Sequence, residues 1–125
     1  MKIILDASFL VRALANPQHP VSRELLSDAQ LVAIPLVALC AACETLQRDK
    51  AQDRSDIVTA IESLIARPNV EVERDAVRAG LLTLISGGDF LDGVVDYEGR
   101  LLGGRTRISA VEHLQDIGDD IVLPS

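Results

Sequence analysis

Three aspartates combine residue type and position in a way that suits metal-ion chemistry. Asp89 and Asp92 stand three residues apart directly after Gly87-Gly88, and Asp6 directly follows the apolar run Ile3-Ile4-Leu5. Residues three apart lie on one face of a helix, so Asp89 and Asp92 would share the first turn of a helix that begins there. Mg²⁺ binds oxygen ligands and needs only one or two carboxylates, because it keeps several of its waters. The pattern therefore predicts a hard-cation site built from these carboxylates.

Each of these aspartates also has a purely structural interpretation. Aspartate is a favoured N-cap residue, so Asp6 fits the position just before a helix. The positive end of the helix dipole favours acids in the first turn by about 0.3–1 kcal/mol, which accounts equally well for Asp89 and Asp92. Position alone does not separate a cation site from well-capped helices, and both interpretations stay open.

The pattern of apolar residues predicts the elements that must position these acids. Short continuous apolar runs are typical of buried parallel strands. They occur at 3–5, 31–34, 70–72 and 121–123, and 106–109 is a candidate for a further strand. Segments with helical spacing, most of them ended by glycine or proline, lie between the strands at 7–15, 21–29, 35–48, 55–66, 74–85, 89–102 and 110–117.

This alternation predicts the fold class. Strands separated by helices indicate an α/β protein in which a mostly parallel sheet is flanked by helices. Since the chain contains no linker, repeat or low-complexity segment, we expect one domain over residues 1–125. Ligands of such sheets bind beyond the carboxyl ends of the strands, and Asp6 follows the first strand directly.

Composition narrows the class of protein. The 125 residues carry a net charge of −7, with 48% hydrophobic and 25% charged residues, which indicates a folded chain. No apolar run reaches the roughly 18 residues of a membrane helix, and Asp6 comes too early for a signal peptide, so we expect a cytoplasmic protein without membrane association. Because acids exceed bases and only three residues are aromatic, contact with nucleic acid would have to run through bound cations.

Several stretches follow the order of one known family. They are 3–14 (IILDASFLVRAL), with a strand, an aspartate and a helix; 34–40, with the end of the second strand and the next helix; and 80–104, whose Gly-Asp-Phe-Leu-Asp core at 88–92 is the most specific part. Together they resemble the PIN domain, and in particular the VapC-type toxin ribonucleases of bacterial toxin–antitoxin pairs. The resemblance covers nearly the whole chain.

The resemblance implies a function as well as a fold. PIN nucleases cleave RNA phosphodiesters with Mg²⁺ or Mn²⁺, since the metal activates a water and neutralises the charge that develops on the phosphoryl group. By resemblance, this chain is a metal-dependent endoribonuclease in which Asp6, Asp89 and Asp92 are the catalytic, metal-binding acids of a one-ion site. The resemblance also implies a cognate antitoxin as partner, RNA as substrate, and a homodimer.

Two positions depart from the family pattern. Ala41 stands where the family has a glutamate, and the aspartate that follows the family's fourth strand has no counterpart near 106–110. Glu44 lies one helical turn after Ala41 and leans back toward it, so it is a candidate replacement ligand; the alternative is an ordinary surface glutamate. The loss of two acids predicts weak or absent cleavage. The alternative function is a non-catalytic, degenerate PIN domain that binds an antitoxin or dimerises.

Cys40 and Cys43 form a Cys-x-x-Cys pair, a spacing that is also found in zinc and redox sites. The chain has no second pair to complete such a site. Free cysteines are among the most frequently buried residues, so we interpret these two as small core residues on one helix.

Overall fold

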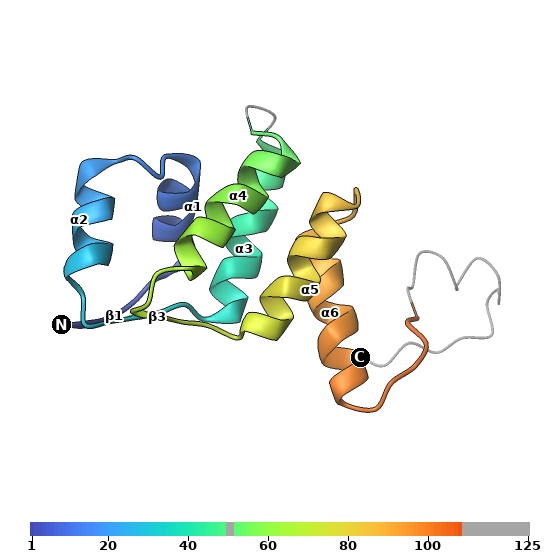
Figure 1. The fold of residues 1–125 in the computed structure, drawn as a ribbon. Helices are drawn as coiled ribbons and strands as arrows, with labels where there is room; N and C mark the ends of the chain where they lie inside the picture. Colours follow the sequence, from blue (N-terminus) through green and yellow to red (C-terminus); the bar gives the residue numbers. More distant parts are fainter. Residues whose placement is uncertain (50–51, 109–125) are drawn as a thin grey trace.

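The structure, a computed structural model of the chain, describes residues 1–49 and 52–108. In this part of the chain, six helices accompany three short strands (Figure 1). The elements are, in order, β1 (Lys2–Ile4), α1 (Ala7–Ala15), α2 (Pro20–Asp28), β2 (Leu31–Ala33), α3 (Leu36–Arg48), α4 (Arg54–Ile65), β3 (Val70–Glu71), α5 (Arg74–Ile85) and α6 (Phe90–Leu101). None of these helices is long and apolar enough to cross a membrane.

The three strands form one parallel sheet in which β2 lies between β1 and β3. Ile3 pairs with Val32, which in turn pairs with Val70. The pairing continues beyond the strands, where the backbone N–H of Ile34 donates to the carbonyl of Glu71 at 3.0 Å. The described part of the chain is therefore a mixed α/β protein with a parallel sheet, which confirms this part of the sequence prediction.

One cluster of buried apolar side chains joins the sheet to the helices. Val32 of β2, Leu10 of α1, Leu39 of α3 and Ile61 of α4 are all fully buried in it. Helix α1 packs against α3 and α4, whereas α6 packs against α3 and α5. Helix α3 therefore stands between the N-terminal elements and α6, an arrangement that can be followed in Figure 1.

Helices α5 and α6 form a close pair that fixes the first turn of α6 (Figure 1). Gly80 of α5 faces the fully buried ring of Phe90, and a Cβ at Gly80 would come within 2.5 Å of that ring. Between the helices, Gly87 has a φ of +103°, a conformation that side chains with a Cβ rarely adopt. The two glycines allow the chain to reverse sharply and let α6 pack tightly on α5.

Most predicted boundaries agree with the structure to within one or two residues. Helix α4 begins at Arg54 and not at Ser55, because Asp53 is its N-cap. The carboxylate of Asp53 accepts a hydrogen bond from the backbone N–H of Asp56 at 2.9 Å.

The C-terminal expectations have a mixed outcome. The prediction of a strand at 106–109 is wrong for residues 106–108, which the structure describes and which belong to no strand. Ion pairs of Arg107 with Asp92 and Asp96 hold this segment against α6 instead. The helix expected at 110–117 and the strand expected at 121–123 lie outside the described residues.

Candidate functional site

The chain reverses between α5 and α6, and this reversal places Asp89 at the start of α6. The backbone N–H of Gly88 donates to the carbonyl of Thr83 at 2.9 Å. From the start of α4, Nη1 of Arg54 donates to the carbonyl oxygen of Leu84 at 3.2 Å and also to that of Gly88. These contacts tie the turn to α4. Asp89 then takes the N-cap position of α6.

Gln47 of α3 fixes the orientation of Asp89. Its Nε2 donates to Oδ1 of Asp89 at 2.9 Å, and its Oε1 accepts from the backbone N–H of Phe90 at 3.3 Å. The Asp89 carboxylate makes no capping bond to its own helix, so the amide of Gln47 satisfies a free N–H of the first turn in its place. The role of Gln47 was not predicted from the sequence, because its partners lie more than forty residues away.

A cleft of about 320 Å³ lies between α3 and the first turn of α6. Asp89 and Asp92 line it from α6, and Glu44 lines it from α3. The remaining lining residues are Gln47, Arg48, Arg54 and Leu91. The positive end of the α6 dipole lies at this cleft and favours anionic side chains there. The structure therefore brings three carboxylates, two of them predicted as primary ligands and one as a replacement, to the same cleft.

Glu44 reaches the cleft but already has a partner. Its Oε1 accepts a hydrogen bond from Nη2 of Arg48 at 2.8 Å, and both side chains are exposed. Exposed ion pairs one helical turn apart contribute only about 0.3–0.5 kcal/mol, so Arg48 is easily displaced. Ala41, at the position of the family's glutamate, is exposed on α3 one turn before Glu44.

Asp92 also has a basic partner, which was not predicted from the sequence. Nη2 of Arg107 donates to Oδ1 of Asp92 at 2.8 Å, and its Nη1 lies 3.6 Å from Oδ1 of Asp96. Arg107 thus bridges two acids that lie one turn apart on α6. Arg107 follows Asp92 by fifteen residues, so only the fold of the intervening turn brings the two together.

Asp6 acts as the N-cap of α1, which confirms its structural interpretation. Its Oδ1 accepts hydrogen bonds from the backbone N–H of Phe9 and from the hydroxyl of Ser8, both at 2.9 Å. The bond from Phe9, followed by that from Ser8, holds the pKa of the Asp6 carboxyl below its ordinary value. Asp6 does not line the cleft of Asp89 and Asp92, and its helix α1 packs mainly against α3 and α4, whereas the cleft lies between α3 and α6. Its role as a metal ligand stays a prediction.

The donor set at the cleft is small for a metal site. Among residues 1–49 and 52–108, no three Asp, Glu, His or Cys side chains form a group that could hold a metal ion, so the predicted cluster of Asp6, Asp89 and Asp92 is not assembled. Mg²⁺ is commonly held by one or two carboxylates and its own waters. Asp89 and Asp92 both line the cleft, so the pair offers carboxylate oxygens, the type of ligand that such a hydrated ion accepts.

Cys40 and Cys43 are buried, unbridged thiols of α3, as expected of core residues. Burial, with a smaller contribution from the neighbouring Cys40, raises the pKa of Cys43 to about 12. Burial also raises the pKa of Cys40, and the charge of Glu98 adds to this effect. A thiol is a nucleophile or a ligand only when deprotonated, so neither cysteine is poised for redox or zinc chemistry.

No protein-family model matches the chain, and no curated protein or solved structure matches it either. The resemblance to PIN domains therefore rests on the amino-acid sequence of this chain alone.

Proposed function

We propose that this chain is a PIN-type, Mg²⁺-dependent endoribonuclease of the VapC toxin class, with low activity. One observation carries the proposal: Asp89 and Asp92, in the block that most resembles the family, open onto a single cleft together with Glu44. The cleft joins two helices that the sequence separates by more than forty residues. It offers hard oxygen donors beside a helix N-terminus, a setting that suits a hydrated cation and a phosphate group.

The residues of the chain have distinct tasks in this proposal. Asp89 and Asp92 hold the cation, which supplies an activated water and neutralises charge on the phosphoryl group. Gln47 is a positioning residue, because its amide keeps the Asp89 carboxylate turned toward α3. Arg54 holds the turn that carries Asp89.

Low activity follows from the acids that are missing. Ala41 supplies no carboxylate, and Glu44 contributes to the cleft only from the next helical turn while paired with Arg48. With fewer carboxylates the cation is held weakly, and little negative charge remains to bind a second one. We therefore expect slow, Mg²⁺-dependent cleavage.

The test is cleavage of a labelled single-stranded RNA as the concentration of Mg²⁺ or Mn²⁺ is raised. Asp92→Asn should abolish cleavage, because it removes the charge while nearly keeping the shape. Asp56→Asn is the matched control, since Asp56 occupies the first turn of α4 as Asp92 does that of α6. Equal activity of the two variants, or no metal-dependent cleavage by the unmodified chain, would contradict the proposal.

One observation favours a second candidate function. Arg107 occupies Asp92 and Asp96, as a basic side chain of an antitoxin would occupy the acids of a PIN site. A degenerate, non-catalytic PIN domain that binds an antitoxin or dimerises needs no accessible cation site. Light scattering of the purified chain measures dimerisation. A dimer that binds no Mg²⁺ and cleaves no RNA would support this second function over the first.

A further inference from the structure

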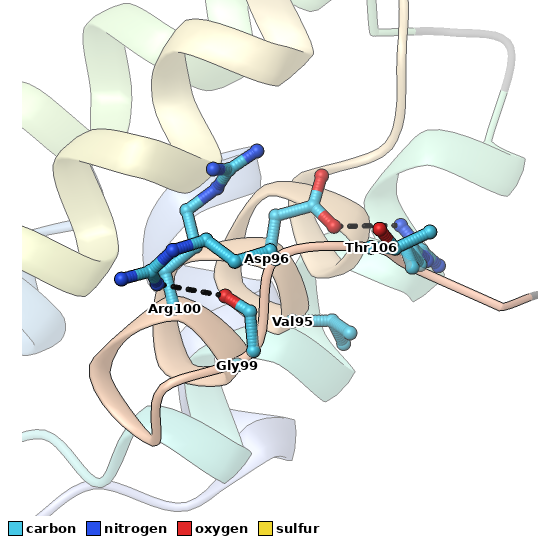
Figure 2. Close-up of a pocket in the computed structure, with 8 residues that line it drawn as sticks. Val95, Asp96, Gly99, Arg100 and Thr106 are labelled. Atoms are coloured by element: carbon cyan, nitrogen blue, oxygen red, sulfur yellow. Dashed lines mark hydrogen bonds and ion pairs between the residues drawn. The ribbon is translucent and has the colours of Figure 1, made fainter.

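A second pocket, of about 200 Å³, lies along α6 where the following segment folds back on the helix (Figure 2). Arg100 lines it from α6, and Arg105 and Arg107 line it from the returning segment. The other lining residues are Val95, Asp96, Gly99, Gly104 and Thr106. We call this cavity the arginine pocket, after its lining residues Arg100, Arg105 and Arg107.

A glycine turn builds the arginine pocket. Gly103 has a φ of +98°, which favours glycine, and the backbone N–H of Gly104 donates to the carbonyl of Gly99 at 2.9 Å. The chain therefore turns back over the last part of α6, and Arg105 and Arg107 come to lie beside it. Figure 2 shows Thr106 of this segment next to Asp96 of the helix.

The charge of the arginine pocket differs from that of the whole chain. The chain carries −7, yet its segment 99–108 contains three arginines and no acid. Arg105 donates to the carbonyl of Gly104 at 3.1 Å. Within the described residues, neither Arg100 nor Arg105 forms an ion pair with a carboxylate, whereas Arg107 pairs with Asp92 and Asp96. In the part of the chain that the structure describes, two guanidinium groups of the arginine pocket therefore have no carboxylate within ion-pair distance, and the Asp96 carboxylate in the same pocket is paired with Arg107.

The arginine pocket adjoins the cleft between α3 and α6. We call this cleft the acidic cleft, after its lining residues Glu44, Asp89 and Asp92. Asp92 lines the cleft, and the Arg107 side chain to which it is bound lines the arginine pocket. A ligand that extends from one to the other would meet carboxylates at one end and guanidinium groups at the next. Guanidinium groups bind phosphate oxygens with two parallel hydrogen bonds, which favours a ligand with repeated phosphates.

We propose that the arginine pocket binds a backbone phosphate of single-stranded RNA, next to the phosphate that lies at the acidic cleft. This inference rests on the proposed ribonuclease function and assigns the side of the cleft along which the RNA runs. The contact reads the backbone and not the bases, so it is independent of sequence and weakens as salt rises.

The test is the binding of a fluorescein-labelled single-stranded RNA, measured by anisotropy in Mg²⁺. Asp89→Asn serves as the background, because it removes a cleft carboxylate while its amide oxygen still accepts from Gln47. In this background, Arg100→Gln with Arg105→Gln is compared with the control pair Arg12→Gln with Arg23→Gln. Both pairs remove two charges, and the control arginines lie on α1 and α2, away from α6 (Figure 1).

We expect the pocket pair to raise the Kd for RNA about tenfold and to reduce the slope of log K against log salt by about 0.7, the value for one lost phosphate contact on a single strand. The control pair should change neither quantity appreciably. Equal losses in both pairs, or no RNA binding at all, would overturn the assignment. A second arm tests inorganic phosphate: if it stabilises the chain through Arg105 while the Kd for RNA is unchanged, the pocket binds small anions and not RNA.

The outcomes also separate this inference from the proposed function. If the unmodified chain cleaves RNA and the pocket pair leaves the Kd unchanged, the inference fails and the nuclease stands. If the pocket pair loses RNA binding while the unmodified chain shows no metal-dependent cleavage, the nuclease fails and the arginine pocket stands as an RNA site.

Discussion

The side-chain amide of Gln47 joins Asp89 to helix α3 across 42 residues of sequence, with Nε2 of Gln47 2.9 Å from Oδ1 of Asp89. The oxygen of the same amide accepts a hydrogen bond from the backbone N–H of Phe90, so one side chain holds both the carboxylate and the first turn of α6. The cleft therefore depends on the packing of α3 against α6 and not only on the spacing of its two aspartates.

Gln47→Leu should lower the free energy of unfolding by about 1–3 kcal/mol, because it leaves the N–H of Phe90 without its acceptor and removes the donor to Asp89. Urea unfolding at neutral pH measures the loss. Gln30→Leu, at an exposed position that follows α2, is the control and should stay within about 0.5 kcal/mol of the unmodified chain. Equal stabilities of the two variants would mean that the Gln47 contacts do not hold α6.

Gly80 and Gly99 make a pair of opposite predictions. Gly80→Ala places a Cβ 2.5 Å from the Phe90 ring and should destabilise the chain by about 1–3 kcal/mol. Gly99→Ala meets nothing within 4 Å in the interior of α6 and should stabilise it by about 0.5–1 kcal/mol, since alanine restricts the unfolded chain. Thermal unfolding measures both. A destabilising Gly99→Ala would show that α6 is packed differently from the structure.

Local sequence signals were sufficient to predict some of these elements but not the contacts between them. Helix α5 and the start of α6 were predicted well, because Gly87-Gly88 and the periodic apolar residues are local signals. The roles of Gln47 and Arg107 were not predicted, because each depends on contacts between segments far apart in the chain. Asp6 illustrates the opposite difficulty: strand end and helix start coincide there, so the same local pattern fits a cap and a metal ligand.

The pH dependence of stability tests Asp6. Its pKa is lowered from the ordinary value of 3.8, chiefly by the bond from Phe9 N–H, so the carboxylate form is favoured in the folded state. Its contribution is therefore complete above the unfolded pKa and is lost as pH falls through the folded pKa. Asp6→Asn should flatten the dependence of stability on pH below about pH 4. An unchanged acid profile would contradict this assignment.

The same variant separates a cap from a ligand. Asp53 caps α4 with the same pattern of bonds, from Ser55 hydroxyl and Asp56 N–H. If Asp6 is only a cap, Asp6→Asn and Asp53→Asn will leave the stabilisation by Mg²⁺ equally unchanged. If Asp6→Asn alone reduces the shift in Tm that Mg²⁺ produces, Asp6 is a ligand as the family resemblance implies.

Arg107→Gln should strengthen Mg²⁺ binding, because Arg107 competes with the cation for Asp92. An exposed ion pair is worth up to about 1 kcal/mol, so the Kd for Mg²⁺ should fall by up to about fivefold. Isothermal titration measures the change. Arg105→Gln removes the same charge without releasing Asp92 and should alter the Kd less. Weaker Mg²⁺ binding by Arg107→Gln would show that the cation does not use Asp92.

Ala41→Glu decides how far the missing glutamate limits activity. Ala41 is exposed one turn before Glu44, so a glutamate fits there without disturbing the core and adds a carboxylate one turn from Glu44, which lines the cleft. We expect tighter Mg²⁺ binding and faster cleavage of RNA. Val37→Glu is the matched control: it adds the same charge to α3 at a position that is 78% exposed and one turn farther from the cleft.

Glu44→Gln completes this comparison. If Glu44 contributes to the cation site, its loss should weaken Mg²⁺ binding in the unmodified chain and matter less in Ala41→Glu, where a second carboxylate takes its place. The two substitutions should then be non-additive in the free energy of Mg²⁺ binding, as expected for residues that share one ligand. Strictly additive effects would indicate that Glu44 does not share the cation with the glutamate at position 41. Tighter Mg²⁺ binding by Ala41→Glu without any cleavage of RNA would favour the degenerate, partner-binding domain over the nuclease.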